Sequence, residues 1–218
     1  MKKLFLLCAG LACLLTFSII FGCGLQKSNV TYTVSVSSLS AALQTASFEV
    51  AADNSAVAGS YTIKTHGFAP SVTVSARNYY STDSRFVTPR TTFNRVHVDY
   101  SVVTDSAGIL TGWTPTSVDS ATNIVIPRSA SGGASGEASG SGEATATVVL
   151  NNITGQAHMA DVGNRILTVN QTVSSGVYSY TLSLRTNLVV RATVTISGQD
   201  EYGNAVSTGF TADIQYTN

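Results

Sequence analysis

Apolar and polar residues alternate along most of this chain. Between Val30 and Val36 every second residue is valine or tyrosine, and threonine or serine fills the positions between them. A period of two that is rich in β-branched residues predicts a strand with one buried face. Comparable runs predict further strands at residues 47–51, 59–65, 71–76, 95–103, 123–126, 144–150, 166–173, 177–184, 190–197 and 206–216.

Turn residues separate these runs. Ser174, Ser175 and Gly176 lie between two predicted strands, which is typical of a β-hairpin. A second turn, from Gly198 to Asn204, joins the two clearest alternating runs. Residues 38–43 are too short to assign to a helical turn, and residues 153–164 remain unassigned. With no long helical periodicity, the pattern predicts an all-β fold, an immunoglobulin-like antiparallel β-sandwich.

One stretch interrupts the alternation. Residues 129–143 consist of serine, alanine, glycine and two glutamates. Such a composition cannot bury enough apolar surface to offset the entropy of ordering, so we expect a long, disordered, flexible loop. The strands before and after it could form two small domains. A single sandwich over residues 29–218 is favoured, because neither half holds a full set of seven clean strands.

The N-terminus carries a targeting signal. Met1 is followed by two lysines, an apolar run from Leu4 to Phe21, and Gly22 before Cys23. A short basic start, an apolar stretch and a small residue form a secretory signal. The 18-residue run is borderline for a retained transmembrane helix, which needs about 20 apolar residues. A plain cleaved signal peptide is a third interpretation, although an Ala-x-Ala-like site is absent.

The end of this signal resembles the lipobox of bacterial lipoproteins. It reads Ile20-Phe21-Gly22-Cys23, with an aliphatic residue three positions before the cysteine and a small residue just before it. The resemblance implies that residues 1–22 are removed as a signal peptide. It also implies that Cys23 is acylated and that residues 23–28 form a lipidated tether to membrane lipid. Gly24, in place of aspartate, resembles the outer-membrane default of Gram-negative lipoproteins.

The cysteine count agrees with a lipid anchor. Cys8, Cys13 and Cys23 are the only three, and the first two lie within the leader. The mature chain would hold one cysteine, so it could form no internal disulfide and no cysteine metal cluster. Two or more acyl chains hold a membrane far better than one, since each buried methylene contributes about 0.8 kcal/mol.

The segment from Thr193 to Tyr216 resembles the last two strands of bacterial immunoglobulin-like or fibronectin-type surface domains. In such domains a strand rich in threonine and valine, an Asp-x-x-Gly-Asn turn and a second alternating strand close the sheet. Here the turn is Asp200-Glu201-Tyr202-Gly203-Asn204. Together with the leader, the chain resembles Ig-like lipoproteins of Gram-negative bacteria, which implies a β-sandwich at the cell envelope.

Charge excludes one class of partner. Without Lys2 and Lys3 the chain keeps 10 basic residues (12 − 2) against 12 acidic ones, a formal charge near −2. Strong nonspecific attraction to nucleic acid is therefore not expected. Charged residues make up 11% of the chain, about half the usual quarter, which is typical of an extracellular β-protein.

The sequence holds little catalytic chemistry. His66, His97 and His158 lie far apart without metalloprotease spacing, and there is no Gly-x-Ser-x-Gly nucleophile elbow or phosphate-binding loop. His97 lies between two valines and is expected to face solvent. We expect no enzyme and no cofactor.

Oxygen-bearing side chains in the terminal turn are the candidate metal ligands. Asp200, Glu201 and Asn204 could contribute to a calcium site, which needs six to eight oxygen ligands. The turn offers too few ligands alone, so ordinary turn chemistry is favoured and calcium binding stays open.

One segment is rich in arginine and aromatic residues. Within 19 positions it contains four of the ten basic residues of the mature chain and four aromatic residues. Arginine and tyrosine are enriched at binding interfaces, so an envelope protein or an anionic glycan could bind here. A crossover between sheets, with packed rings and paired arginines, is the favoured alternative. The candidate residues are Arg77, Tyr79, Tyr80, Arg85, Arg90 and Arg95.

Three functions are compatible with this sequence. A lipid-anchored, non-enzymatic binding or scaffold module needs only a presented face, and this is the main expectation. A lipid-anchored hydrolase acting on envelope polymers would need His97 or His158 beside a serine and an orienting acid. A subunit of a surface fibre would need an exposed strand edge, for which residues 30–36 are the first candidate.

Overall fold

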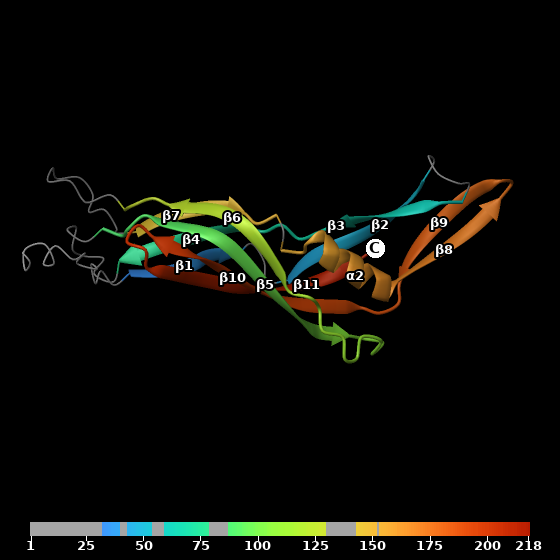
Figure 1. Cartoon of the computed structure of the whole chain (residues 1–218). Coiled ribbons are helices and arrows are strands. Elements are labelled where there is room, and N and C mark those ends of the chain that lie inside the picture. Colours follow the sequence, from blue (N-terminus) through green and yellow to red (C-terminus); the bar gives the residue numbers. More distant parts are fainter. Residues whose placement is uncertain (1–31, 40–42, 54–58, 79–86, 130–142, 152) are drawn as a thin grey trace, which may run out of the picture. The chain divides into compact units, whose positions relative to one another are not determined.

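The computed structural model describes residues 32–39, 43–53, 59–78, 87–129, 143–151 and 153–218. Residues 1–31 lie outside this part, so the leader, the acylation of Cys23 and the tether stay predictions. The described residues form eleven strands and one helix (Figure 1). The strands are β1 (Tyr32–Leu39), β2 (Leu43–Ala52), β3 (Tyr61–His66), β4 (Ser71–Asn78), β5 (Thr91–Asp105), β6 (Val118–Ile126), β7 (Glu143–Val149), β8 (Leu167–Ser174), β9 (Val177–Leu184), β10 (Leu188–Asp200) and β11 (Ala205–Thr217), and the helix is α2 (Gln156–Ile166).

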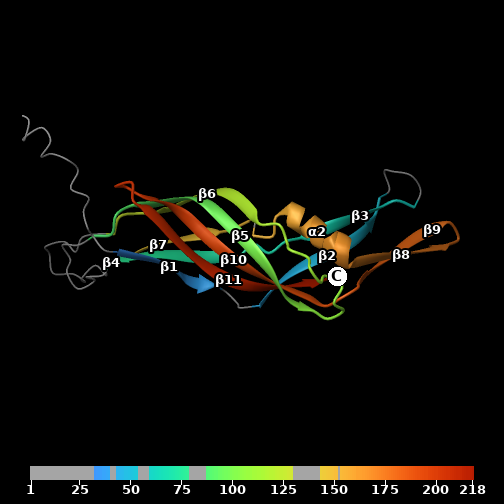
Figure 2. The same ribbon diagram turned by 60° about the horizontal axis from the view of Figure 1, so that its bottom comes forward.

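Two sheets pack around one apolar core. The smaller has the strand order β1-β4-β7, and the larger has the order β3-β2-β11-β10-β5-β6. The strand pairs of the described residues are antiparallel except for β2 and β11, which run parallel where Leu43 to Ser47 face Asp213 to Thr217. Figure 2 shows both sheets, with β8 and β9 as a separate two-stranded hairpin. The prediction of an all-β sandwich is confirmed.

The alternation in the sequence builds the core. Successive side chains of a strand point to opposite faces, so each strand contributes every second residue to the space between the sheets. Burying each valine, leucine or isoleucine in this way contributes roughly 1.5–3 kcal/mol. Two strands illustrate the pattern, with Leu188, Val190, Ala192, Val194 and Ile196 buried on β10 and Val72, Val74 and Ala76 buried on β4.

Strands from both sides of the serine-, glycine- and alanine-rich run share the larger sheet. β5 pairs with β10, and β2 pairs with β11. Residues 130–142 of the run lie outside the described part. The two ends of the predicted loop differ from expectation, because Ser129 is buried and its hydroxyl accepts a hydrogen bond from Thr88 N, while Glu143 begins β7.

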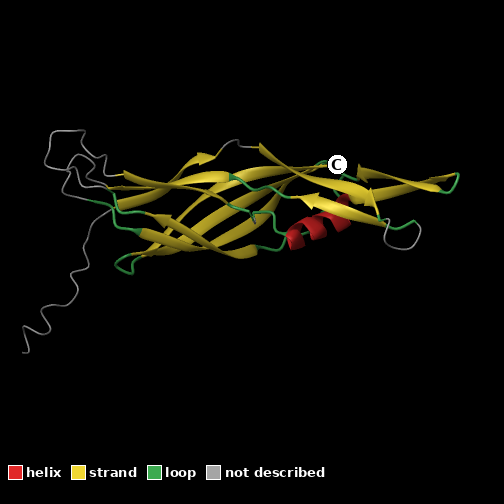
Figure 3. Cartoon of the chain, turned by 90° about the horizontal axis from the view of Figure 1, so that it is seen from above, coloured by secondary structure: helices red, strands yellow, loops and turns green. Residues whose placement is uncertain are grey.

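The helix α2 lies in the stretch that alternation leaves unassigned (Figure 3). Its buried face carries Met159, Val162 and Ile166, at the spacing of a helix face. Gly163 lies on this face too, where a Cβ would be 3.1 Å from Cε1 of Phe48 on β2. Few large apolar residues and a central glycine give a weak helical signal, which is why periodicity does not predict α2. No helix among the described residues is long and apolar enough to span a bilayer.

Candidate functional site

The β8–β9 hairpin is a two-stranded sheet separate from the other two, and its turn lies beyond the ends of β2 and β3 (Figure 1). Its register is unbroken from Leu167 opposite Leu184 to Ser174 opposite Val177. Ser175 and Gly176 form the turn with φ angles of 51° and 78°. Two consecutive positive φ angles are typical of a type I′ turn, whose twist matches that of the flanking strands. The hairpin predicted from the turn residues is therefore present.

One face of this hairpin lies against β2 and β3. The ring centroids of Tyr180 and Tyr61 are 5.3 Å apart. A Cβ at Gly59, just before β3, would lie 3.0 Å from Cε1 of Tyr178. At the base, the backbone N–H of Arg185 donates to the carbonyl oxygen of Ile166 in α2 over 2.7 Å. The base is thus fixed to the helix, and the inner face is packed on the larger sheet.

The outer half of the hairpin exposes apolar side chains. Val173, Val177 and Tyr178 are 59%, 64% and 37% exposed. From Leu167 to Leu184 the sequence has no charged residue and no proline. Strands of this composition, when exposed, are where proteins pair with other chains.

The two edge strands of the larger sheet carry charged side chains, and the hairpin carries none. β3, at one end, carries Lys64 and a contact between His66 Nε2 and Glu49 Oε2 at 3.5 Å. β6, at the other end, carries Asp119. Charged side chains on an edge strand oppose its pairing with another chain. Within the described part of the chain, β8 and β9 pair only with one another, so the hairpin has strand edges with no charge to guard them.

The predicted candidate edge, residues 30–36, coincides with β1 from Tyr32 onward. β1 lies at an edge of the smaller sheet, and Val30 and Thr31 lie outside the described residues. Its register with β4 shifts between Val36 and Ser38. A bulge of this kind twists an edge strand and opposes pairing with another chain. β1 is therefore a less suitable pairing edge than the uninterrupted β8.

The predicted arginine-rich patch is only partly described. Tyr79, Tyr80 and Arg85 lie outside the described residues. Arg77 is exposed on β4, and Arg90 is exposed just before β5.

Arg95, on β5, belongs to a network of charges. Its Nε donates to Asp119 Oδ1 on β6 over 2.7 Å. His97 contacts the same oxygen through Nδ1 at 3.0 Å and Asp99 through Nε2 at 3.2 Å. The hydrogen bond from Arg95, followed by that from His97, lowers the pKa of the Asp119 carboxyl. The charge of Arg95 is thus matched by an acid on the neighbouring strand, as in the alternative in which the arginines are paired.

The terminal turn uses its carboxylate internally. Asp200 accepts hydrogen bonds from the backbone N–H groups of Tyr202 (2.9 Å) and Asn204 (2.8 Å), from Asn204 Nδ2 (2.8 Å) and from the Tyr32 hydroxyl (3.2 Å). Burial raises the pKa of Asp200, but the hydrogen bonds from Asn204 and Tyr202 outweigh it, so the net pKa is lowered. Glu201 pairs with Arg128. These bonds occupy the Asp200 carboxylate, and the described residues contain no group of three or more His, Cys, Asp and Glu side chains placed to hold a metal ion.

His158 is a buried histidine in α2. Its Nε2 lies 2.7 Å from the Tyr216 hydroxyl, and its ring stacks on Tyr100 with centroids 3.8 Å apart. The Tyr100 hydroxyl donates to the carbonyl oxygen of Ile153. Burial lowers the pKa of His158 to about 4, and the charge of Asp161 opposes this only in part. A neutral ring between two phenols is typical of a core histidine, and these contacts do not form a serine–histidine–acid arrangement.

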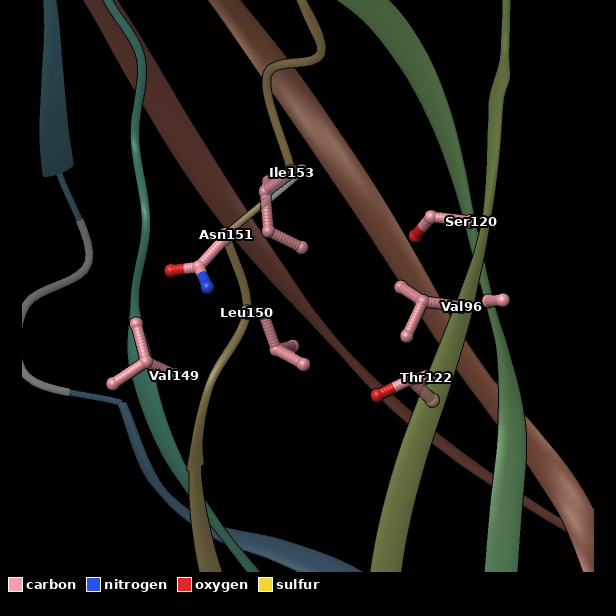
Figure 4. Close-up of a pocket in the computed structure, with 8 residues that line it drawn as sticks. Val96, Ser120, Thr122, Val149, Leu150, Asn151 and Ile153 are labelled. Carbon is pink, nitrogen blue, oxygen red and sulfur yellow. The ribbon is translucent and has the colours of Figure 1, made fainter.

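A small cavity opens between β6 and the segment that follows β7 (Figure 4). Its volume is about 140 Å³. Ser120 and Thr122 border it from β6, and Leu150 and Ile153 border it from the opposite side. Its other lining residues are Val96, Ala121, Val149 and Asn151, so no titratable side chain faces it. The cavity offers no acid, base or nucleophile pair for hydrolysis.

The hairpin is the functional candidate that sequence patterns do not single out. Alternation predicts β8 and β9 but not that their edges remain open, because pairing is decided by distant strands. The sequence feature that indicates the hairpin is the absence of charged residues over positions 167–184, because β3 and β6 both carry charged residues. The chain matches no protein-family model, no curated protein and no solved structure.

Proposed function

We propose that this protein is a lipid-anchored, non-enzymatic binding or scaffold module of the cell envelope, which engages a partner protein through the β8–β9 hairpin. The observation that carries the proposal is an uncharged hairpin with exposed valine and tyrosine side chains and open strand edges. The lipobox-like residues before Cys23 support an acyl anchor, and Gly24 supports the outer membrane as its location.

The hairpin and the start of β1 lie at different ends of β10. The Tyr32 hydroxyl contacts Asp200 at the C-terminal end of β10. The hairpin joins the opposite end of the same strand, just before Leu188. β10 has 13 residues, which corresponds to about 40 Å. Tyr32, the first described residue, and the hairpin therefore lie toward opposite ends of β10.

A protein is a better partner for this hairpin than an anionic glycan or nucleic acid. The hairpin has backbone donors and acceptors at its edges and no positive charge to attract an anion. The one arginine of the predicted patch whose partner is described, Arg95, is already paired with Asp119. Strand pairing or apolar contact is what the hairpin surface can offer.

Intact mass of the membrane-extracted protein, beside a Cys23→Ala variant, tests the anchor. We expect a mature chain that begins at Cys23 and carries acyl mass, and loss of membrane attachment in the variant. An unmodified chain in the soluble fraction would overturn the lipid-anchored module.

Cross-linking in intact cells tests the binding surface. The double variant Val173→Thr, Val177→Thr keeps β-branched residues but removes exposed apolar surface, and we expect it to lose cross-linked species that the parent forms. Val103→Thr is the matched control, because Val103 is 46% exposed on β5, outside the hairpin. Equal loss in both variants, or retention in both, would exclude the hairpin as the binding surface.

A further inference from the structure

The β8–β9 hairpin is incomplete as a sheet. A two-stranded hairpin is at best marginally stable in water, and three or more strands are needed for independent stability. Here the inner face rests on β2 and β3, as the contact between Tyr61 and Tyr180 shows. The outer half beyond these contacts has Val173 and Val177 mainly in solvent. A further strand along one edge would supply the missing backbone partners.

β8 offers the more open edge of the hairpin. β9 lies beside β2, and its Tyr180 ring lies near Tyr61 of β3. The side chain of Gln171 on β8 approaches Gly59, as Tyr178 of β9 does, but the backbone of β8 pairs only with β9 among the described strands. β8 also runs for eight residues, Leu167–Ser174, without a register shift, a charge or a proline. A strand of another chain can therefore approach along β8.

We infer that β8 pairs antiparallel with β8 of a second copy of this chain, about a two-fold axis, to form a four-stranded sheet in the order β9-β8-β8′-β9′. In an antiparallel pair, residues directly opposite one another share a face of the sheet. Two-fold symmetry then requires that one residue faces itself. This inference deepens the proposed binding function, on which it rests, by naming the partner.

One register makes the two strands self-complementary. With Gln171 opposite its own copy, Val169 faces Val173 on one side of the sheet, and Asn170 faces Thr172 on the other. Centring the pair on Asn170 or on Thr172 instead would place a valine opposite Gln171. Among the registers that pair at least five residues of β8, only the one centred on Gln171 matches apolar with apolar and polar with polar, and none of its pairs opposes like charges.

The composition of the edge favours a second copy over a charged partner. The hairpin edge is neutral throughout, so it complements an identical neutral edge better than a charged one. In the register given, the two hairpin bases lie at opposite ends of the new sheet, about 25 Å apart, so the two sandwiches extend in opposite directions.

Cysteine cross-linking tests the register in the full-length, detergent-extracted protein. Gln171→Cys should give a disulfide-linked dimer on mild oxidation, because facing residues near the axis bring two Cα atoms within about 4.5–5.5 Å. Thr181→Cys, on β9, and Thr193→Cys, on the interior strand β10, are matched exposed controls and should stay monomeric. The parent chain gives the background from its own cysteines. A dimer through Thr181 but not Gln171, or none above background, would overturn the β8 pairing.

A pair of charge variants separates pairing from folding. In the register given, Asn170→Lys with Thr172→Lys opposes lysines across the axis, and we expect the dimer dissociation constant to rise at least about tenfold. Asn170→Glu with Thr172→Lys places opposite charges across the axis and should keep the dimer. Sedimentation of the two variants and the parent measures this. A monomeric parent, or equal dimerisation of both variants, would overturn the inference.

Intact mass and sedimentation of the same samples test the lipid anchor and the β8 pairing separately. A dimer whose intact mass lacks acyl chains would remove the lipid anchor and leave strand pairing in place. An acylated chain that sediments as a monomer at all concentrations would leave the anchor in place and remove β8 pairing.

Discussion

The sandwich and the β8–β9 hairpin are made from the same kinds of residue, but they differ in what covers them. On β10, Val194 and Ile196 are almost fully buried between two sheets. On the hairpin, Val173 and Val177 are more than half exposed. A buried valine contributes roughly 1.5–3 kcal/mol, and an exposed one contributes little. The difference shows that the exposed valines of the hairpin add little to folding and are available to a partner.

Charge separates the two regions as well. On the outer face of the sandwich, Arg191 and Asp213 pair at 2.7 Å between β10 and β11. The hairpin has no charged residue over 18 positions. Surface ion pairs contribute little to stability, but charges keep strands from pairing with other chains. Charged side chains therefore oppose association of the sandwich with other chains, and the hairpin has no such charges.

The largest expected contrast is in the free energy of unfolding. Ile214 on β11 is fully buried, so Ile214→Ala should lower the free energy of unfolding by about 3 kcal/mol through lost burial and a residual cavity. Val177→Ala should change it by less than about 0.5 kcal/mol. Urea denaturation followed by circular dichroism measures both variants. Similar losses in the two would show that the hairpin is part of the folding core.

The next effect is a loss of sandwich stability on acidification. The pKa of His158 falls from 6.5 to about 4 on folding, because burial disfavours its charged form. Between these values the unfolded chain takes up a proton that the folded chain does not. The contribution is therefore complete above the unfolded pKa and is lost as the pH falls toward the folded one, by roughly 3 kcal/mol. Urea denaturation at steps across this pH range measures the slope.

A histidine variant identifies the source of that slope. His158→Gln should flatten it, because it removes the buried imidazole whose pKa burial lowers. The lowered pKa values of Asp200 and Asp213 act in a more acidic window, below the ordinary carboxyl pKa of about 4. A slope that survives His158→Gln would assign the acid sensitivity to another group.

A smaller effect is expected at the turn between β10 and β11. Asp200→Ala removes the acceptor for two backbone N–H groups and two side-chain donors, and should cost about 2 kcal/mol. Glu201→Ala is the matched control, since it removes only the surface contact with Arg128 and should cost at most about 1 kcal/mol. Thermal denaturation of both variants measures the difference. Equal costs would show that the internal bonds of Asp200 do not stabilise this turn.

Sequence alternation predicts the strands because their burial pattern is local. The runs at residues 190–197 and 206–216 become β10 and β11, and every second residue of β10 from Leu188 to Ile196 is buried. The parallel pairing of β2 with β11 joins Leu43 to Asp213, and no local pattern specifies a partner so far along the chain. The helix α2 is not predicted, because Gly163 has a low helix propensity. Its small size fits the close approach of Phe48, which the local sequence does not indicate.

The candidate sites follow the same division. Arg95 pairs with Asp119 because of the register between β5 and β6. The spacing of Arg95 from Arg77 and Arg90 along the sequence does not predict this register. The open edge of β8 depends on which strands the larger sheet leaves unpaired. Composition could have indicated the hairpin, because a neutral run of 18 residues is measurable from the sequence alone.

The smallest expected effect tests whether the hairpin is independent of the sandwich. Ser175 has a φ of 51°, which asparagine adopts more readily than serine, so Ser175→Asn should stabilise the type I′ turn by less than about 1 kcal/mol. Gly176→Ala is the opposite control, because a side chain at a φ of 78° is strained although no atom lies near its Cβ. Hydrogen exchange should slow at the hairpin amides in the first variant and quicken in the second, with global unfolding unchanged in both. A change in global unfolding would mean that hairpin and sandwich unfold as one unit, and the contrast between them would fail. If the hairpin responds alone, its marginal stability is what a pairing strand would relieve, and Ser175→Asn should also tighten the dimer by lowering the cost of ordering it.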